Sequence, residues 1–97
     1  MKSTEEILGI LRRARPELAR DFGVTRLALF GSYARGDQRD GSDVDILVEV
    51  PPSIGLRFVD LADRLEALLG IRSEVISRRA IAPRHWEIIE RDLLDVA

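Results

Sequence analysis

The sequence predicts an α/β domain in which a small mixed β-sheet is flanked by helices. Segments with apolar residues at helical spacing alternate with short apolar segments of strand character, in the order α-β-α-β-α-β-α. The 97 residues contain no internal repeat and no linker of small polar residues. We therefore expect residues 1–97 to form one domain.

The first predicted helix begins after Ser3. Ser3 and Glu6 have the spacing of a capping box, in which each side chain satisfies a free amide of the first turn. Pro16 is expected to kink or restart the helix, and Gly23 is expected to end it. The apolar residues at helical spacing are Ile7, Leu8, Ile10, Leu11, Ala14 and Leu18.

Two strands and a polar connection are predicted next. Residues 26–30 have the composition of a short buried strand. Residues 31–41 are polar and contain three glycines, so we expect a turn, a short helical piece and a loop. Residues 44–50 alternate between two faces, which predicts a second strand. Two prolines end that strand.

The remainder is predicted to be helix, strand and helix. An amphipathic helix is expected over residues 56–69, closed by Gly70, and a strand over residues 71–77. Pro83 opens a final helix whose apolar face we expect to close the core, with a partner surface as the alternative for part of it. This face consists of Trp86, Ile89, Leu93 and Leu94.

Composition excludes several classes of protein. Lys and Arg number 15 against 17 Asp and Glu, and the formal net charge of −2 argues against direct nucleic-acid binding over a broad surface. The absence of cysteine excludes disulfides, thiolate zinc sites and cysteine catalysis. No apolar run approaches the roughly 18–20 residues that span a bilayer, and the acidic start is unlike a secretion signal. We therefore expect a cytoplasmic protein that binds no membrane.

An acidic pair marks the start of the second strand. Asp43 and Asp45 stand two residues apart, so both carboxylates point to the same side. A divalent cation between them relieves their repulsion, because Mg²⁺ binds carboxylate oxygens and leaves sites for phosphate and water. The alternative is a pair of acids in a solvated turn.

Gly31 and Ser32 follow the first strand directly. Glycine permits an open backbone, and the amides that follow, together with the Ser32 hydroxyl, can donate hydrogen bonds to a phosphate. The alternative is an ordinary strand-to-helix turn with Ser32 as its N-cap. A phosphate cradle and a carboxylate pair in one domain are the two parts that phosphoryl-type transfer needs.

The segment from Leu29 to Val48 resembles the minimal nucleotidyltransferase (MNT) family. The family is defined by Gly-Ser, ten residues and Asp-x-Asp, which here are Gly31-Ser32 and Asp43-Val-Asp45. The flanking Ala-Arg-Gly and Ser-Asp sequences match as well, and the resemblance extends over nearly the whole chain. It implies a core of the DNA polymerase β-like superfamily that binds a nucleoside triphosphate with two Mg²⁺ ions.

The resemblance also implies metal ligands. The family usually has an Asp after an apolar residue in the third position, whereas Glu74 is one methylene longer and follows Ser73. The alternative for Glu74 is an exposed strand carboxylate paired with Arg72 or Arg78. The three implied metal ligands, which are also the catalytic carboxylates, are Asp43, Asp45 and Glu74.

Nucleotide-binding residues follow from the same resemblance. Gly31 and Ser32 would hold the triphosphate, and Arg35 would reach its β- or γ-phosphate. The alternative for Arg35 is a loop arginine paired with Asp37 or Asp40.

Other chemically capable residues are given structural interpretations. Tyr33 is expected to be a packing or surface residue rather than an acceptor of nucleotidyl groups. Arg78 and Arg79 are expected on a solvated face rather than against nucleic acid. His85, the one histidine, is expected at the surface beside Trp86.

The resemblance implies an activity and a partner. MNT proteins resemble antitoxins partnered with HEPN-domain ribonuclease toxins, which implies transfer of AMP from ATP to a tyrosine hydroxyl of such a toxin. One alternative is a binding module with a degenerate nucleotide site that neutralises the toxin by complex formation, and Glu74 in place of Asp keeps it open. A weaker alternative is transfer to a small molecule such as an antibiotic hydroxyl.

Overall fold

The computed structural model describes all 97 residues and confirms the predicted α/β class. Short 3-10 helices cover Pro52–Ile54 and Arg78–Ala80. A two-residue strand near the C-terminus was not predicted. The helices and strands are α1 (Thr4–Phe22), β1 (Arg26–Phe30), α2 (Gly31–Arg35), β2 (Val44–Glu49), α3 (Arg57–Leu69), β3 (Ser73–Ser77), α4 (Pro83–Glu90) and β4 (Leu94–Asp95).

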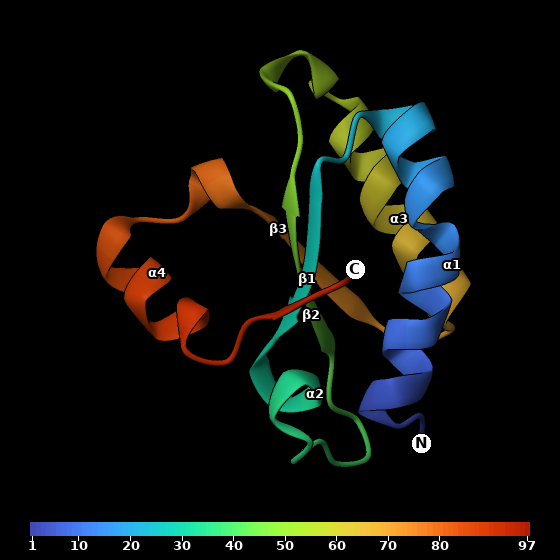
Figure 1. Cartoon of the computed structure of the whole chain (residues 1–97), viewed down its shortest axis with the longest axis vertical. Coiled ribbons are helices and arrows are strands. Elements are labelled where there is room, and N and C mark those ends of the chain that lie inside the picture. Colours follow the sequence, from blue (N-terminus) through green and yellow to red (C-terminus); the bar gives the residue numbers. More distant parts are fainter.

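The four strands form one mixed sheet in the order β3-β2-β1-β4 (Figure 1). β1 pairs antiparallel with β2 and with β4, whereas β2 and β3 run parallel. Asp45 of β2 lies opposite Phe30 of β1 and opposite Glu74 of β3. The register therefore places two of the predicted metal ligands side by side.

The hydrophobic core lies between the sheet and the helices α1 and α3, which cover one face of it (Figure 1). Val44, Ile46 and Val48 of β2 point into this core and are fully buried, as their alternation predicts. Because side chains alternate along a strand, Asp45 must point to the opposite face. A register slip of one residue would bury the acid and expose the valines.

Helix α1 has the predicted ends. The N–H of Glu6 donates to the Ser3 hydroxyl at 3.1 Å, and the N–H of Ser3 donates to Glu6 Oε1 at 3.1 Å. Gly23 ends the helix in a left-handed conformation. Pro16 lies inside this one helix, so the predicted restart there is wrong. None of the helices combines the length and the apolar character that crossing a membrane requires.

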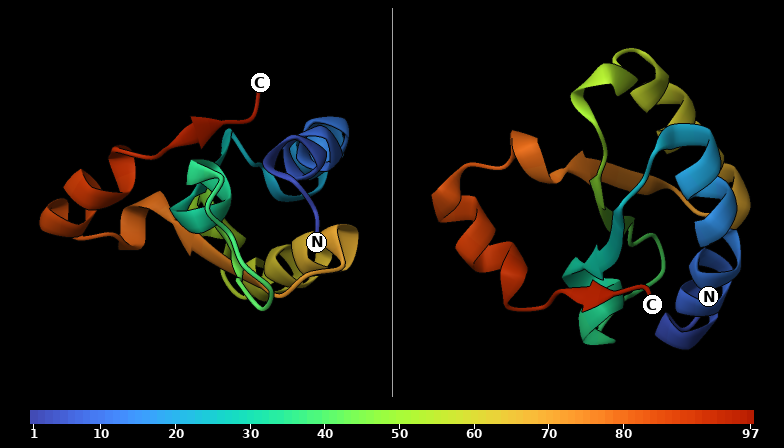
Figure 2. Two further views of the ribbon diagram at one scale, coloured as in Figure 1. Left: turned by 90° about the horizontal axis from the view of Figure 1, so that it is seen from below. Right: turned by 45° about the horizontal axis from the view of Figure 1, so that its top comes forward.

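The prediction that the last helix closes the core is wrong. α4 lies on the other side of the sheet from α1 and α3 and contains no buried residue (Figure 2). The core face is already filled by those two helices, and Val96 closes it from the C-terminal segment. Trp86 instead packs against cations, with the Arg78 guanidinium 3.9 Å and the Arg26 guanidinium 5.9 Å from its ring centroid.

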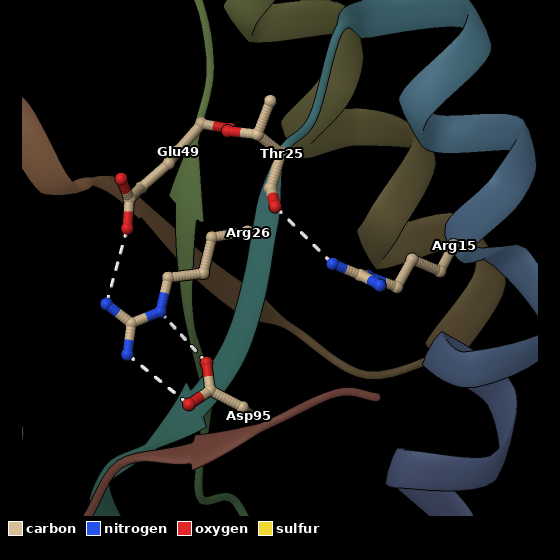
Figure 3. Close-up of polar contacts among 5 residues, drawn as sticks. All are labelled: Arg15, Thr25, Arg26, Glu49 and Asp95. Carbon is tan, nitrogen blue, oxygen red and sulfur yellow. Dashed lines mark hydrogen bonds and ion pairs between the residues drawn. The ribbon is translucent and has the colours of Figure 1, made fainter.

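Arg26 joins three strands at the end of the sheet remote from Asp45 (Figure 3). Its Nε donates to Asp95 of β4 at 2.9 Å, and its Nη1 donates to Glu49 of β2 at 3.3 Å. Hydrogen bonding to Arg26 lowers the pKa of Asp95. Arg15 of α1 donates to the carbonyl oxygen of Thr25 at 3.4 Å. The Arg26–Asp95 ion pair thus links the short strand β4 to β1.

Candidate active site

Two of the predicted acids, Asp45 and Glu74, lie side by side near the point where β1 runs into α2. Neighbouring strands lie about 4.8 Å apart, so the register of β2 and β3 makes Asp45 and Glu74 close neighbours. Both side chains are on the sheet face that α1 and α3 leave free, with Asp45 half-buried and Glu74 exposed. Glu74 is an exposed strand carboxylate, as the alternative interpretation expected, but it forms no ion pair with Arg72 or Arg78.

Gly31 packs directly against the Asp45 carboxylate. Its φ is +71°, in the left-handed region that glycine tolerates. A Cβ at this position would overlap Oδ2 of Asp45 and lie 3.1 Å from its Cγ. Glycine is therefore required both by the backbone conformation and by the close approach to the acid.

Asp45 carries uncompensated negative charge. Burial, followed by the nearby charges of Glu74 and Asp43, raises its pKa to about 6. Arg35 is the opposing cation and lowers the pKa, but it does not cancel the other contributions. A carboxylate whose pKa is raised by burial and by like charges is typical of a site that receives a cation or a proton.

The carboxylates fit a magnesium site that substrate completes. No three His, Asp or Glu side chains converge closely enough to hold a metal ion by themselves. Mg²⁺ commonly takes one or two protein carboxylates and obtains its other ligands from substrate phosphates and water. The adjacent Asp45 and Glu74 provide such a pair, and Asp43 is near enough to raise the pKa of Asp45.

Ser32 lies in the first turn of α2 and is not its N-cap. Phe30 occupies the N-cap position in an extended conformation, and no side chain caps the helix. The alternative of an ordinary capped turn is therefore wrong. The carbonyl of Ser32 accepts from the N–H groups of Gly36 and Asp37, at 2.9 and 3.1 Å, so it closes the turn at the end of the helix. Ser32 itself is half-buried.

Arg35 is held between two acids. Its Nε donates to Asp37 at 3.1 Å, which was one of the alternatives, and its Nη1 donates to Asp92 at 3.1 Å. Asp40 is not a partner. Asp92 lies 57 residues away along the chain, and no local pattern indicated it. These hydrogen bonds raise the pKa of Arg35, whose charge acts on Asp45.

The other candidates lie where the structural interpretations place them. Tyr33 is 2% exposed and belongs to the core cluster. His85 and Arg79 are exposed, and Arg78 covers the ring of Trp86. His85 does not join the acids in a metal-binding group.

Known proteins are similar to this chain in sequence and in fold. The model of the family described as nucleotidyltransferase domain matches residues 11–95. The protein adenylyltransferase MntA of Thermococcus cleftensis is 43% identical over 98 residues, which are 99% of this chain and 98% of that protein.

Solved structures of nucleotidyltransferases and MNT antitoxins are similar to this chain in fold. A structure provisionally named a minimal nucleotidyltransferase is 36% identical with a TM-score of 0.80, over 96% of this chain and 95% of that one. A chain from the complex of tri-AMPylated Shewanella oneidensis HEPN toxin with MNT antitoxin has a TM-score of 0.66 at 18% identity, over 93% of this chain and 71% of that one. The latter likeness concerns the fold alone.

Replacing Gly31 by alanine is expected to destabilise the protein more than replacing Gly36. Both glycines have positive φ, 71° and 80°, so each substitution incurs the left-handed penalty of about 1–2 kcal/mol. Only Gly31→Ala also collides with Asp45, since the space around Gly36 is open. Chemical denaturation of both variants measures the difference. Equal losses would contradict the proposed packing of Gly31 on the acid.

Asp45→Asn is expected to stabilise the ligand-free chain at pH 7. The folded pKa of about 6 exceeds the ordinary value of 3.8, so the folded state binds the proton more tightly than the unfolded chain does. Wild-type stability is therefore lost as pH rises from about 4 to about 6. The full shift corresponds to roughly 3 kcal/mol, which solvent screening at this half-buried group reduces to about 1–2 kcal/mol.

Urea denaturation of both proteins between pH 4 and pH 8, without added divalent cations, measures this pH dependence. Glu49→Gln is the matched control, because Glu49 is on the same strand and already pairs with Arg26. The stability difference between Asp45→Asn and wild type should grow across this pH range. A difference that stays constant or shrinks would show that Asp45 is not under electrostatic stress.

Proposed function

Because the chain belongs to the nucleotidyltransferase domain family, we propose that this enzyme transfers AMP from ATP to a tyrosine hydroxyl of a HEPN-type toxin. The predicted resemblance to minimal nucleotidyltransferases is confirmed by the family match and by the relatives. The observation that carries the proposal is the pairing of Asp45 with Glu74 beside the backbone of Gly31. The name of the Thermococcus cleftensis relative, protein adenylyltransferase, supports AMP as the transferred group.

The reaction joins the acceptor oxygen to the α-phosphorus of ATP. This bond forms as the bond between the α-phosphorus and the bridging oxygen breaks, so pyrophosphate leaves and the hydroxyl proton passes to water. The reaction needs no nucleophile from the protein, because catalysis consists of positioning and electrostatic stabilisation.

The carboxylates would hold the Mg²⁺ ions that we expect with ATP. Asp43 and Asp45 are proposed as shared ligands, and Glu74 is proposed to complete the second position. When bound, Mg²⁺ neutralises triphosphate charge and lowers the pKa of the attacking hydroxyl. The protein itself keeps the carboxylates adjacent through the β2–β3 register.

The turn after β1 is proposed to bind the triphosphate. Gly31 lets the backbone approach the nucleotide and the acids at the same time. The hydroxyl of Ser32 donates to a phosphate oxygen. Arg35 has more than one carboxylate partner, so it can exchange one of them for the β- or γ-phosphate and keep the other.

The HEPN partner and the tyrosine acceptor come from the resemblance and from a neighbouring structure. That structure joins an MNT antitoxin to a tri-AMPylated HEPN toxin, and its likeness to this chain is in the fold. We propose that this chain acts in the same way, in the cytoplasm, as the antitoxin of a two-protein system.

The second candidate function is toxin neutralisation by binding alone. Two observations favour it: Glu74 stands in place of the usual Asp, and the acids do not form a complete metal-binding group by themselves. In this alternative the nucleotide site is degenerate, and complex formation inactivates the toxin.

The double variant Asp43→Ala, Asp45→Ala is expected to abolish AMP transfer. The wild-type chain, incubated with its purified HEPN partner, ATP and Mg²⁺, should raise the intact mass of the partner by one or more AMP units. The double variant should give no gain, because the carboxylates that bind the ions are gone. Asp60→Ala, which removes an exposed acid of α3, is the control and should transfer normally.

Toxin activity measured in the same reactions separates the two functions. If the double variant transfers no AMP and still neutralises the toxin, the binding alternative replaces the catalytic proposal. If wild type itself adds no AMP under conditions in which a known adenylyltransferase does, the catalytic proposal fails.

A further inference from the structure

A cavity borders the candidate active site. Its volume is about 640 Å³, and it opens between the loop before β2, the start of α1 and the segment before β3. Asp43 forms part of its wall, whereas Gly31, Asp45 and Glu74 do not. The cavity is therefore next to the acids without being the nucleotide site proposed above.

Three basic side chains line this cavity, and none of them forms an ion pair. They come from separate segments: Lys2 precedes α1, Arg39 lies in the loop before β2, and Arg72 lies just before β3. None of their side chains takes part in an ion pair, in contrast to Arg26 and Arg35. Unpaired cations around one concave surface favour an anionic ligand.

The cavity also contains three acids, Glu6, Asp40 and Asp43. Hydrogen bonds from Ser3 and the nearby charge of Lys2 lower the pKa of Glu6, so Glu6 and Lys2 offset each other's charge, and Asp43 belongs to the proposed metal site. Asp40 is exposed and makes no ion pair. An anionic group is therefore attracted most strongly to the side of the cavity between Arg39 and Arg72.

Part of the remaining wall is apolar. Ile71 contributes to it and packs on the hydrophobic core, and the buried Tyr33 lies behind it. An inorganic phosphate makes no apolar contact with such a wall. A polypeptide segment can, because it places apolar and charged side chains at alternate positions. The mixture of surfaces favours a peptide over an inorganic anion.

The spacing connects this cavity to the transfer reaction. Asp43 precedes Asp45 by two residues, about 7 Å along an extended chain. An extended peptide advances about 3.3–3.6 Å per residue. A hydroxyl placed over the carboxylates and a side chain in the cavity are therefore separated by a few residues of the same segment.

We propose that this cavity is the acceptor-binding site, which holds the polypeptide segment beside the hydroxyl that receives AMP. An acidic side chain of that segment, within a few residues of the tyrosine, lies between Arg39 and Arg72. The assignment as an acceptor site rests on the proposed function. The cavity thereby selects protein acceptors in an acidic sequence context.

Peptide binding in the absence of ATP tests the site separately from catalysis. The probe is a ten-residue peptide with one tyrosine and a glutamate two residues from it, compared with the same peptide carrying glutamine. Amide shifts of the ¹⁵N-labelled protein report where each peptide binds. We expect the glutamate peptide to shift amides at residues 39–43 and 71–72 and to bind at least about tenfold more tightly than the glutamine peptide.

The variant Arg39→Glu, Arg72→Glu should lose this preference. Both side chains are exposed, so the substitutions leave the core intact, and the amide spectrum verifies folding. The matched control is Arg12→Glu, Arg13→Glu, which reverses two exposed arginines of α1 outside the cavity and should retain it. Equal binding of the two peptides, binding elsewhere, or unchanged preference in the cavity variant would overturn the proposal.

Inorganic phosphate serves as a further probe. If phosphate shifts the same amides and binds more tightly than the glutamate peptide, the cavity is a simple anion site and the acceptor proposal is wrong. The intact-mass assay is independent of these titrations. If the peptide binds but no AMP is transferred, the proposed function is rejected and the cavity remains a peptide site. If AMP is transferred but the peptide does not bind in the cavity, only the acceptor site is rejected.

Discussion

The contact between Gly31 and the Asp45 carboxylate is the constraint on which the site depends. It requires that the residue directly after β1 have no side chain and that β2 turn its acid away from the core. Burial of Val44 and Ile46 under α1 and α3 fixes that orientation of β2. The parallel pairing with β3 then places Glu74 beside Asp45. The hydrophobic core thus positions charges that lie on the opposite face of the sheet.

The same arrangement leaves the ligand-free site under electrostatic stress. Burial and two neighbouring acids raise the pKa of Asp45, and Arg35 opposes this only in part because it is also bound to Asp37 and Asp92. A bound cation would relieve the repulsion, and triphosphate would complete the coordination of that cation. Repulsion between acids that lowers the stability of the ligand-free protein is common at sites that bind charged substrates.

Much of the fold and the centre of the site follow from local patterns in the sequence. The capping box, the alternation in β2 and the spacing of Gly31, Asp43 and Asp45 each involve residues close in the chain. Long-range contacts escaped prediction. The pairing of Arg35 with Asp92 depends on where the chain returns after α4. The apolar face of α4 resembled a core face, but Trp86 is covered by Arg78 and Arg26 on the other side of the sheet. The unpaired cations of the acceptor cavity likewise meet only in the folded chain.

The most direct test of the central claim is the rate of AMP transfer by two Glu74 variants. Glu74 is exposed, so neither substitution should unfold the protein. If the Asp45–Glu74 pair binds metal for catalysis, Glu74→Gln should lose on the order of 100-fold in rate, the scale of effect expected when a reacting group is misplaced by about 1 Å. Glu74→Asp, which restores the usual family residue, should transfer at a rate within about tenfold of wild type, one power of ten being about 1.4 kcal/mol of barrier. A Glu74→Gln enzyme that transfers AMP as fast as wild type would contradict the account.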